Sequence, residues 1–172
     1  MAQELLELRK SLLEGRYGDA LDLVDELEEM SKQAILRNME SFLVRLMVHL
    51  IKNQVEQRLT NSWAASISES LLRIQKLNLR DNKVSYYVNR QGWLPMLEEA
   101  LEAAIAPASV EILGDGLSPL QLSDRIDRPE MLALAQRLLD LIYDYSAKTL
   151  PSAINQALMQ LPGGQSWAEG NA

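Results

Sequence analysis

The chain has no cysteine and a single histidine in 172 residues. Without cysteine it can form neither disulfide bonds nor thiolate metal sites, and it has no thiol nucleophile. A single histidine also falls short of the paired Glu-x-x-His motifs with which helical bundles hold two iron ions. Glycine-rich phosphate-binding loops are missing as well. We therefore expect no bound metal and no cofactor, and the lack of cysteine fits a reducing compartment.

Long apolar runs are missing too. The most apolar stretch, residues 42–51, is interrupted by Arg45 and His49, and it is far shorter than the about 20 apolar residues that span a bilayer. Residues 1–10 carry several charged side chains, whereas a secretory signal needs an uncharged apolar core. We expect no membrane insertion and a cytoplasmic location.

Aromatic residues make up only 5% of the chain, while leucine, alanine, glutamate and glutamine are frequent. This composition favours helix over strand. Apolar residues recur at helical spacing in most segments, and glycine, proline and capping residues separate these segments. The pattern predicts helices near residues 5–13, 19–30, 31–59, 61–77, 84–106 (with a kink or a restart at Gly92), 128–148 and 152–160.

This order of segments predicts an all-α, single-domain bundle of about six to seven helices over residues 1–161. The most specific local signal is Asp127 followed by Pro129 and Glu130, a cap with proline in the first helical turn. Residues 107–123 are predicted to form an irregular connection, because Gly114, Gly116 and Pro119 interrupt the pattern there. Residues 162–172 begin with Pro-Gly-Gly and are predicted to be a disordered tail.

Three motifs carry a resemblance to a known family. They are EGRYGDALDLVDELEEM (residues 14–30), LVRLMVHLIKNQ (residues 43–54) and NSWAASI (residues 61–67). In this order and spacing they resemble the family called domain of unknown function 29, which is common in cyanobacteria. The resemblance covers roughly residues 2–105 and implies a helical fold. It implies no activity and no catalytic residue, since the family has none that is settled.

Acidic side chains outnumber basic ones, 24 to 17, and the formal charge is −7. This charge opposes attraction to nucleic acid and to anionic lipid. The local exception is a basic segment that also contains aromatic residues: Arg73, Lys76, Arg80, Lys83, Tyr86, Tyr87, Arg90 and Trp93. Such residues can bind phosphates and stack on bases, can bind an acidic protein, or can form a solvated face with aromatic residues in the core. We favour the last, and expect no nucleic-acid partner.

His49 lies at the edge of the apolar stripe of the helix predicted over residues 31–59. Further along that helix the stripe turns polar, because Asn53, Gln54 and Gln57 take up the angles of earlier apolar residues. The functional hypothesis is a small polar pocket with His49 as a general acid or base. Its residues are His49, Asn53, Glu56, Gln57 and Trp63. The simpler interpretation, which we favour, is a boundary histidine on a helix that leaves the core.

A stripe of four carboxylates, Asp22, Asp25, Glu26 and Glu29, follows one side of the segment 19–30. Carboxylates gathered on one helix face invite comparison with metal sites in helical bundles. The histidines that such sites need are absent, so we expect a solvated acidic face instead.

Two functions remain open from the sequence. The leading hypothesis is a noncatalytic protein-interaction module that binds another protein, with a homo-oligomer as a further arrangement. The alternative is an enzyme or small-ligand binder that uses the cluster around His49. An interaction module should expose an apolar patch of several hundred Å², whereas an enzyme should gather His49, Asn53 and Glu56 around a concave pocket.

We predict no useful affinity for duplex DNA at physiological salt, because 24 carboxylates surround the basic segment. A titration of labelled duplex at several salt concentrations measures this. Submicromolar binding that weakens steeply with salt, and that disappears when Arg73, Lys76 and Arg80 are changed to alanine, would contradict the prediction.

Overall fold

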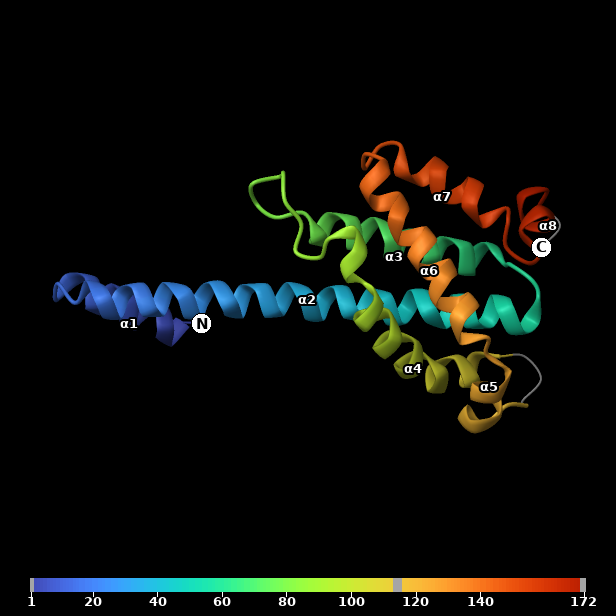
Figure 1. Cartoon of the computed structure of the whole chain (residues 1–172), viewed down its shortest axis with the longest axis horizontal. Coiled ribbons are helices and arrows are strands. Elements are labelled where there is room, and N and C mark those ends of the chain that lie inside the picture. The colour runs from blue at the N-terminus through green and yellow to red at the C-terminus, as the bar shows by residue number, and fades with distance from the viewer. Residues whose placement is uncertain (1, 113–115, 171–172) are drawn as a thin grey trace. The chain divides into compact units, whose positions relative to one another are not determined.

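The computed structural model describes residues 2–112 and 116–170 (Figure 1). Helices account for 78% of the structure. In the described ranges the only β-type pairing is an isolated bridge between Leu79 and Tyr86. The prediction of an all-α fold is confirmed.

Eight α-helices and one short 3-10 helix follow one another along the described chain. They are α1 (Ala2–Leu13), α2 (Tyr17–Glu56), α3 (Asn61–Asn78), η1 (Arg90–Gly92), α4 (Leu94–Glu111), α5 (Pro119–Arg125), α6 (Arg128–Asp144), α7 (Leu150–Leu158) and α8 (Gly164–Ala168).

The chain divides into two compact units, Met1–Asn38 and Met39–Ala172. Helix α2 contributes its first part to the first unit and its second part to the second. Compactness alone does not establish independent folding, so the expectation of one domain over residues 1–161 stays a prediction.

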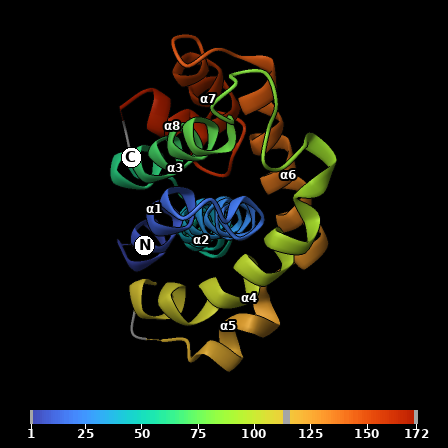
Figure 2. The same cartoon turned by 90° about the vertical axis from the view of Figure 1, so that its left-hand side faces the viewer.

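The first unit is a helical hairpin, in which α1 lies beside the start of α2 (Figures 1 and 2). The turn is a Schellman motif: the Arg16 N–H donates to the Ser11 carbonyl at 2.8 Å and the Gly15 N–H to the Leu12 carbonyl at 3.2 Å. Gly15 has φ +72°, the left-handed conformation that suits glycine. The sequence correctly places the end of the first helix at this residue.

Helix α2 runs without a break through Ser31, where the sequence predicts the start of a new helix. That prediction is wrong. No glycine or proline occurs between Asp19 and Glu56, and serine costs little in a helix interior. A possible capping residue therefore starts no helix where its neighbours continue one.

The second unit is built around the second half of α2, with α3 and α4 on opposite sides of it in both views (Figures 1 and 2). Helix α6 contacts α3, α4 and α7, and so joins the two sides. Buried apolar side chains from α2, α3, α4 and α6 form most of the core, and they include Leu46, Leu50, Ile67, Leu71, Leu97, Leu101, Leu138 and Leu139.

Residues 84–89 are not helical, which corrects the helix expected from residue 84. The Asn82 carboxamide oxygen accepts hydrogen bonds from the Val84 and Ser85 N–H groups at 2.9 and 3.0 Å. Lys83 takes a left-handed φ of 59°. These side-chain bonds satisfy backbone groups locally, and so they compete with helix formation.

The buried Asn78 side chain holds the following segment in an extended form. It donates to the Val88 carbonyl and accepts from the Val88 N–H, both at 2.8 Å. The Tyr143 hydroxyl also donates to the Val88 carbonyl, at 2.6 Å, and accepts from the Trp93 indole at 2.7 Å. Trp93 is fully buried. This aromatic residue of the basic segment is therefore part of the core.

The connection expected over residues 107–123 is also partly helical. Helix α4 continues through Pro107 to Glu111, which is tolerated because Pro107 and Ala103 face solvent, so water can reach the carbonyl that proline leaves unpaired. Helix α5 begins at a capping box in which the Ser118 and Gln121 side chains each bond the other's backbone N–H. Gly114 lies outside the described residues.

Helices α6 and α7 begin near the capping and proline residues that predict their starts in the sequence. Asp127 caps α6, its carboxylate accepting from the Glu130 N–H at 3.2 Å. Helix α7 begins at Leu150 with Pro151 in its first turn.

The structure describes residues 162–170 and places α8 within them, which differs from the disordered tail expected from the sequence. The Asn53 amide donates to the Pro162 carbonyl at 2.8 Å and to the Arg58 carbonyl at 3.0 Å. The Trp167 indole donates to the Asn61 side chain at 3.3 Å. These bonds hold the segment against the turn between α2 and α3, and nothing local in the sequence signals them.

We predict that Gly163→Ala destabilises the fold by about 2–5 kcal/mol. Gly163 has φ +73°, and an added Cβ would lie 2.7 Å from the Arg58 Cα. Gly18→Ala is the matched control, because an added Cβ there meets nothing within 4 Å; it should change stability by less than about 1 kcal/mol. Urea unfolding of both variants measures the difference, and equal stabilities would contradict the close approach at Gly163.

Candidate functional site

The five residues of the predicted pocket lie near the end of α2 and the start of α3. Asn53 is buried and uses its amide to join two backbone segments. Gln57 follows α2 in a left-handed conformation, with φ 55°, and donates to the Gln54 carbonyl at 2.7 Å. Both side chains take part in the hydrogen bonding of the turn that follows α2.

Trp63 lies in a cluster of charges that the sequence does not reveal. The Lys52 ammonium and the Arg58 guanidinium lie 4.6 and 4.7 Å from the centre of its ring. The Lys52 ammonium is also 3.2 Å from a Glu111 carboxylate oxygen of α4, and Arg58 donates to Glu56 at 3.3 Å. Cation–π and ionic contacts therefore tie α2, α3 and α4 together.

Lys52 is the least expected member of this cluster, since its side chain is only 7% exposed. A lysine is rarely buried unless its charge is paired, and Glu111 and the Trp63 ring supply that pairing. Sequence reasoning missed Lys52 and Arg58 because their partners lie in other segments. An amphipathic pattern cannot report such contacts.

His49 is partly buried, and its Nδ1 atom has no hydrogen-bond partner in the described part of the chain. Burial, together with the nearby charges of Lys52 and Arg45, lowers the pKa of His49 from its usual 6.5 to about 4. Glu111 acts in the opposite direction. His49 is therefore neutral at pH 7, which disfavours a role as a general acid there. The pocket hypothesis itself stays a prediction.

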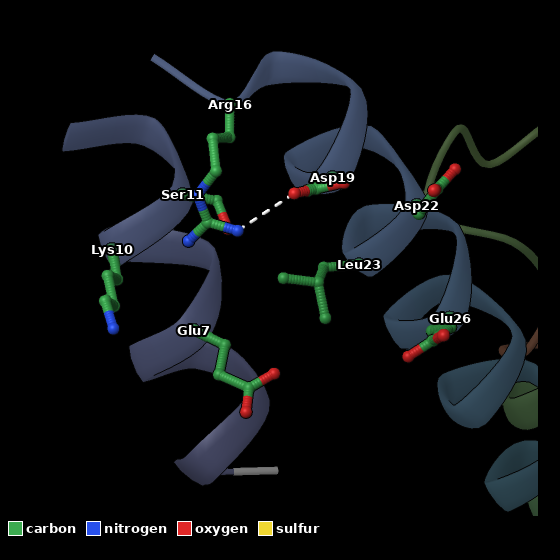
Figure 3. A pocket seen from close by; sticks show the side chains of 8 residues that line it. All are labelled: Glu7, Lys10, Ser11, Arg16, Asp19, Asp22, Leu23 and Glu26. Carbon is green, nitrogen blue, oxygen red and sulfur yellow. Dashed lines mark hydrogen bonds and ion pairs between the residues drawn. The ribbon is translucent and has the colours of Figure 1, made fainter. Parts of the chain in front are cut away.

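The hairpin of the first unit has a charged groove between α1 and α2, shown in Figure 3. It has a volume of about 420 Å³. Glu7 and Lys10 of α1 line one side, and Asp22 and Glu26 of α2 line the other. Near the turn, Arg16 pairs with Asp19 at 2.9 Å and with Glu14 at 2.8 Å.

A second groove of the hairpin is apolar. It encloses about 270 Å³ and shares no lining residue with the charged groove. We call its lining residues the apolar face: Leu8, Leu12, Tyr17, Ala20, Leu21 and Val24. Leu12, Tyr17 and Leu21 are 51%, 66% and 65% exposed. Of these six residues, only Ala20 is buried.

The other sequence candidates form no chemical site in the described residues. Asp22, Asp25, Glu26 and Glu29 are all exposed. Within residues 2–112 and 116–170, no three histidine or carboxylate side chains are placed to hold a metal ion. In the same ranges, no helix combines the length and the apolar character needed to cross a membrane.

Fold and surfaces together define an all-helical protein with an amphipathic hairpin. The family model described as Domain of unknown function DUF29 matches residues 5–113. The chain belongs to this family, and the resemblance inferred from the sequence motifs is confirmed. No curated protein and no solved structure matches the chain.

We predict that the fold loses stability as the pH falls from about 6.5 to about 4, in part through His49. Because the pKa is lower in the folded chain, the unfolded chain binds more protons in this window. Neutral His49 therefore contributes its full stability above pH 6.5. His49→Gln should remove about 1 kcal/mol of this pH dependence, a value discounted for the exposed part of the ring.

At pH 7, His49→Gln should cost no more than about 1 kcal/mol. Urea unfolding of the wild type and of the variant at pH 7 and pH 4.5 measures both predictions. Titration of the carboxylates affects both proteins alike, so it cancels in the difference between their unfolding free energies. If His49→Gln leaves the unfolding free energy unchanged but removes ligand binding or turnover, the result would support the pocket hypothesis instead.

Proposed function

We propose that the protein is a noncatalytic interaction module that binds another protein through the apolar face of its hairpin. The observation that carries the proposal is the exposure of large apolar side chains in a unit with almost no core. In the described part of this unit only Ser11 and Ala20 are buried, while eight large apolar side chains are exposed. The eight are Leu5, Leu6, Leu12, Leu13, Tyr17, Leu21, Val24 and Met30.

Scattered exposed leucines are ordinary on a protein surface. The arrangement here is different, because α1 and α2 bring several of these side chains together along one groove. Contiguous apolar surface of this kind is typical of interaction sites. Covering the exposed half of each side chain would contribute on the order of 1 kcal/mol.

The shape of the groove suits a helical ligand. Two neighbouring helices present a channel between rows of side chains, and an amphipathic helix can lay its apolar side in such a channel. From Tyr17 to Val24 the wall formed by α2 is about 10 Å long, which corresponds to about two helical turns. A short partner helix would therefore be sufficient.

The alternative function rests on the cluster around His49. Its Asn53 amide is occupied by two backbone carbonyls, and its histidine is neutral at pH 7. These observations give less support to catalysis than the apolar face gives to protein binding.

We predict that the double substitution Leu12→Ser and Leu21→Ser abolishes capture of the partner from a lysate of the source cell. Both side chains lie on the apolar face and are more than half exposed, so the helices should be retained, as checked by circular dichroism. Leu120→Ser is the matched control, since Leu120 is 81% exposed on α5, outside the hairpin. If the double variant captures the same proteins as the wild type, the apolar face is not the binding site.

A further inference from the structure

The charges beside the apolar face restrict what can bind there. Asp25 lies one helical turn from Leu21, and Glu28 lies one turn from Val24, so both carboxylates border the apolar face on α2. Both are exposed. Neither forms an ion pair with any residue in the described ranges.

The hairpin has few cations of its own to balance these carboxylates. Residues 1–38 contain nine acidic and five basic side chains. Arg16 is already bound to Glu14 and Asp19. On α1 the cation next to the apolar face is Arg9, one turn from Leu5 and from Leu12.

A second copy of the chain is a poor match for this face. In a symmetric pair, the same patch meets itself. The carboxylates at the α2 edge would then face either the same carboxylates or the α1 edge of the other copy, where Arg9 is the adjacent cation. Like charges placed opposite one another disfavour the first arrangement. In the second, both carboxylates of each copy would meet a single adjacent cation.

We propose that the occupant is a basic amphipathic helix of another protein, with leucine-like side chains in the groove and lysine or arginine along the edge that faces α2. This inference rests on the proposed function and specifies the chemistry of the partner. Apolar contact supplies most of the affinity, while the charges on Asp25 and Glu28 set the orientation and favour basic partners.

Two synthetic peptides of about 18 residues test the charge preference. Both carry leucine at the inward positions of a helix, and they differ only in having lysine or glutamate at the flanking positions. Fluorescence anisotropy with full-length protein measures binding. We expect the lysine peptide to bind at least about tenfold more tightly than the glutamate peptide, with a preference that shrinks as salt is raised.

Two double variants distinguish the effect of the charges beside the apolar face from the effect of the net charge of the protein. Asp25→Asn with Glu28→Gln should weaken binding of the lysine peptide about fivefold or more and leave binding of the glutamate peptide unchanged or stronger. Glu98→Gln with Glu99→Gln removes the same charge from an exposed part of α4 and should leave both affinities unchanged. Leu12→Ser with Leu21→Ser should abolish binding of the lysine peptide.

Several results would overturn this inference and leave the proposed function standing. One is that the glutamate peptide binds as tightly as the lysine peptide or more tightly, while partner capture still depends on Leu12 and Leu21. The same holds if neither peptide binds and partner capture keeps this dependence. Another is an equal loss of binding in the Glu98 and Glu99 variant, which would indicate nonspecific charge attraction. A dimer in sedimentation experiments that the Leu12 and Leu21 variant dissociates would instead identify a second copy as the occupant, and it would overturn both this inference and the proposed binding of another protein.

Discussion

The second unit depends on one buried amide. Asn53 lies on α2, is almost fully buried, and donates to carbonyls of two other segments, one in the α2–α3 turn and one after α7. A hydrogen bond of this kind contributes only about 1 kcal/mol, yet a buried carbonyl left without a donor costs about 1–3 kcal/mol. This side chain therefore couples the α2–α3 turn to the C-terminal segment, in addition to the hydrogen bond from Trp167 to Asn61. The close approach of Gly163 to Arg58 and the charge cluster around Trp63 are built on this arrangement.

Sequence reasoning succeeded where local chemistry decides the structure. Gly15 ends α1, and Asp127 with Pro129 starts α6, because each residue satisfies or replaces backbone groups within its own turn. It failed at Ser31 and Pro107, where a local signal for a helix boundary is overruled by helix-forming neighbours or by access to water. It also failed at residues 84–89, where Asn78 and Asn82 satisfy the backbone through side-chain bonds.

The candidate sites were predictable to different degrees. The polar end of the α2 stripe is visible in the sequence, and Asn53 and Trp63 do lie at a structural junction. The role of Lys52 is not visible, because its partners Glu111 and Trp63 come from other helices. For the hairpin, the sequence shows that the segments are amphipathic. Only the arrangement of α1 beside α2 shows that the two helices leave their apolar residues largely uncovered.

A hairpin with so small a core is held together mainly by the turn that connects its helices. An isolated helix of about 12 residues is marginal in water, and separating α1 from α2 would expose little additional apolar surface. Such an opening belongs among the low-energy fluctuations of a native protein, well below global unfolding. A partner that binds to the hairpin must then supply the free energy of ordering α1, which favours reversible association over very high affinity. In hydrogen exchange, the amides of α1 would report on the presence of the partner, while those of α3 and α6 would report on the stability of the second unit.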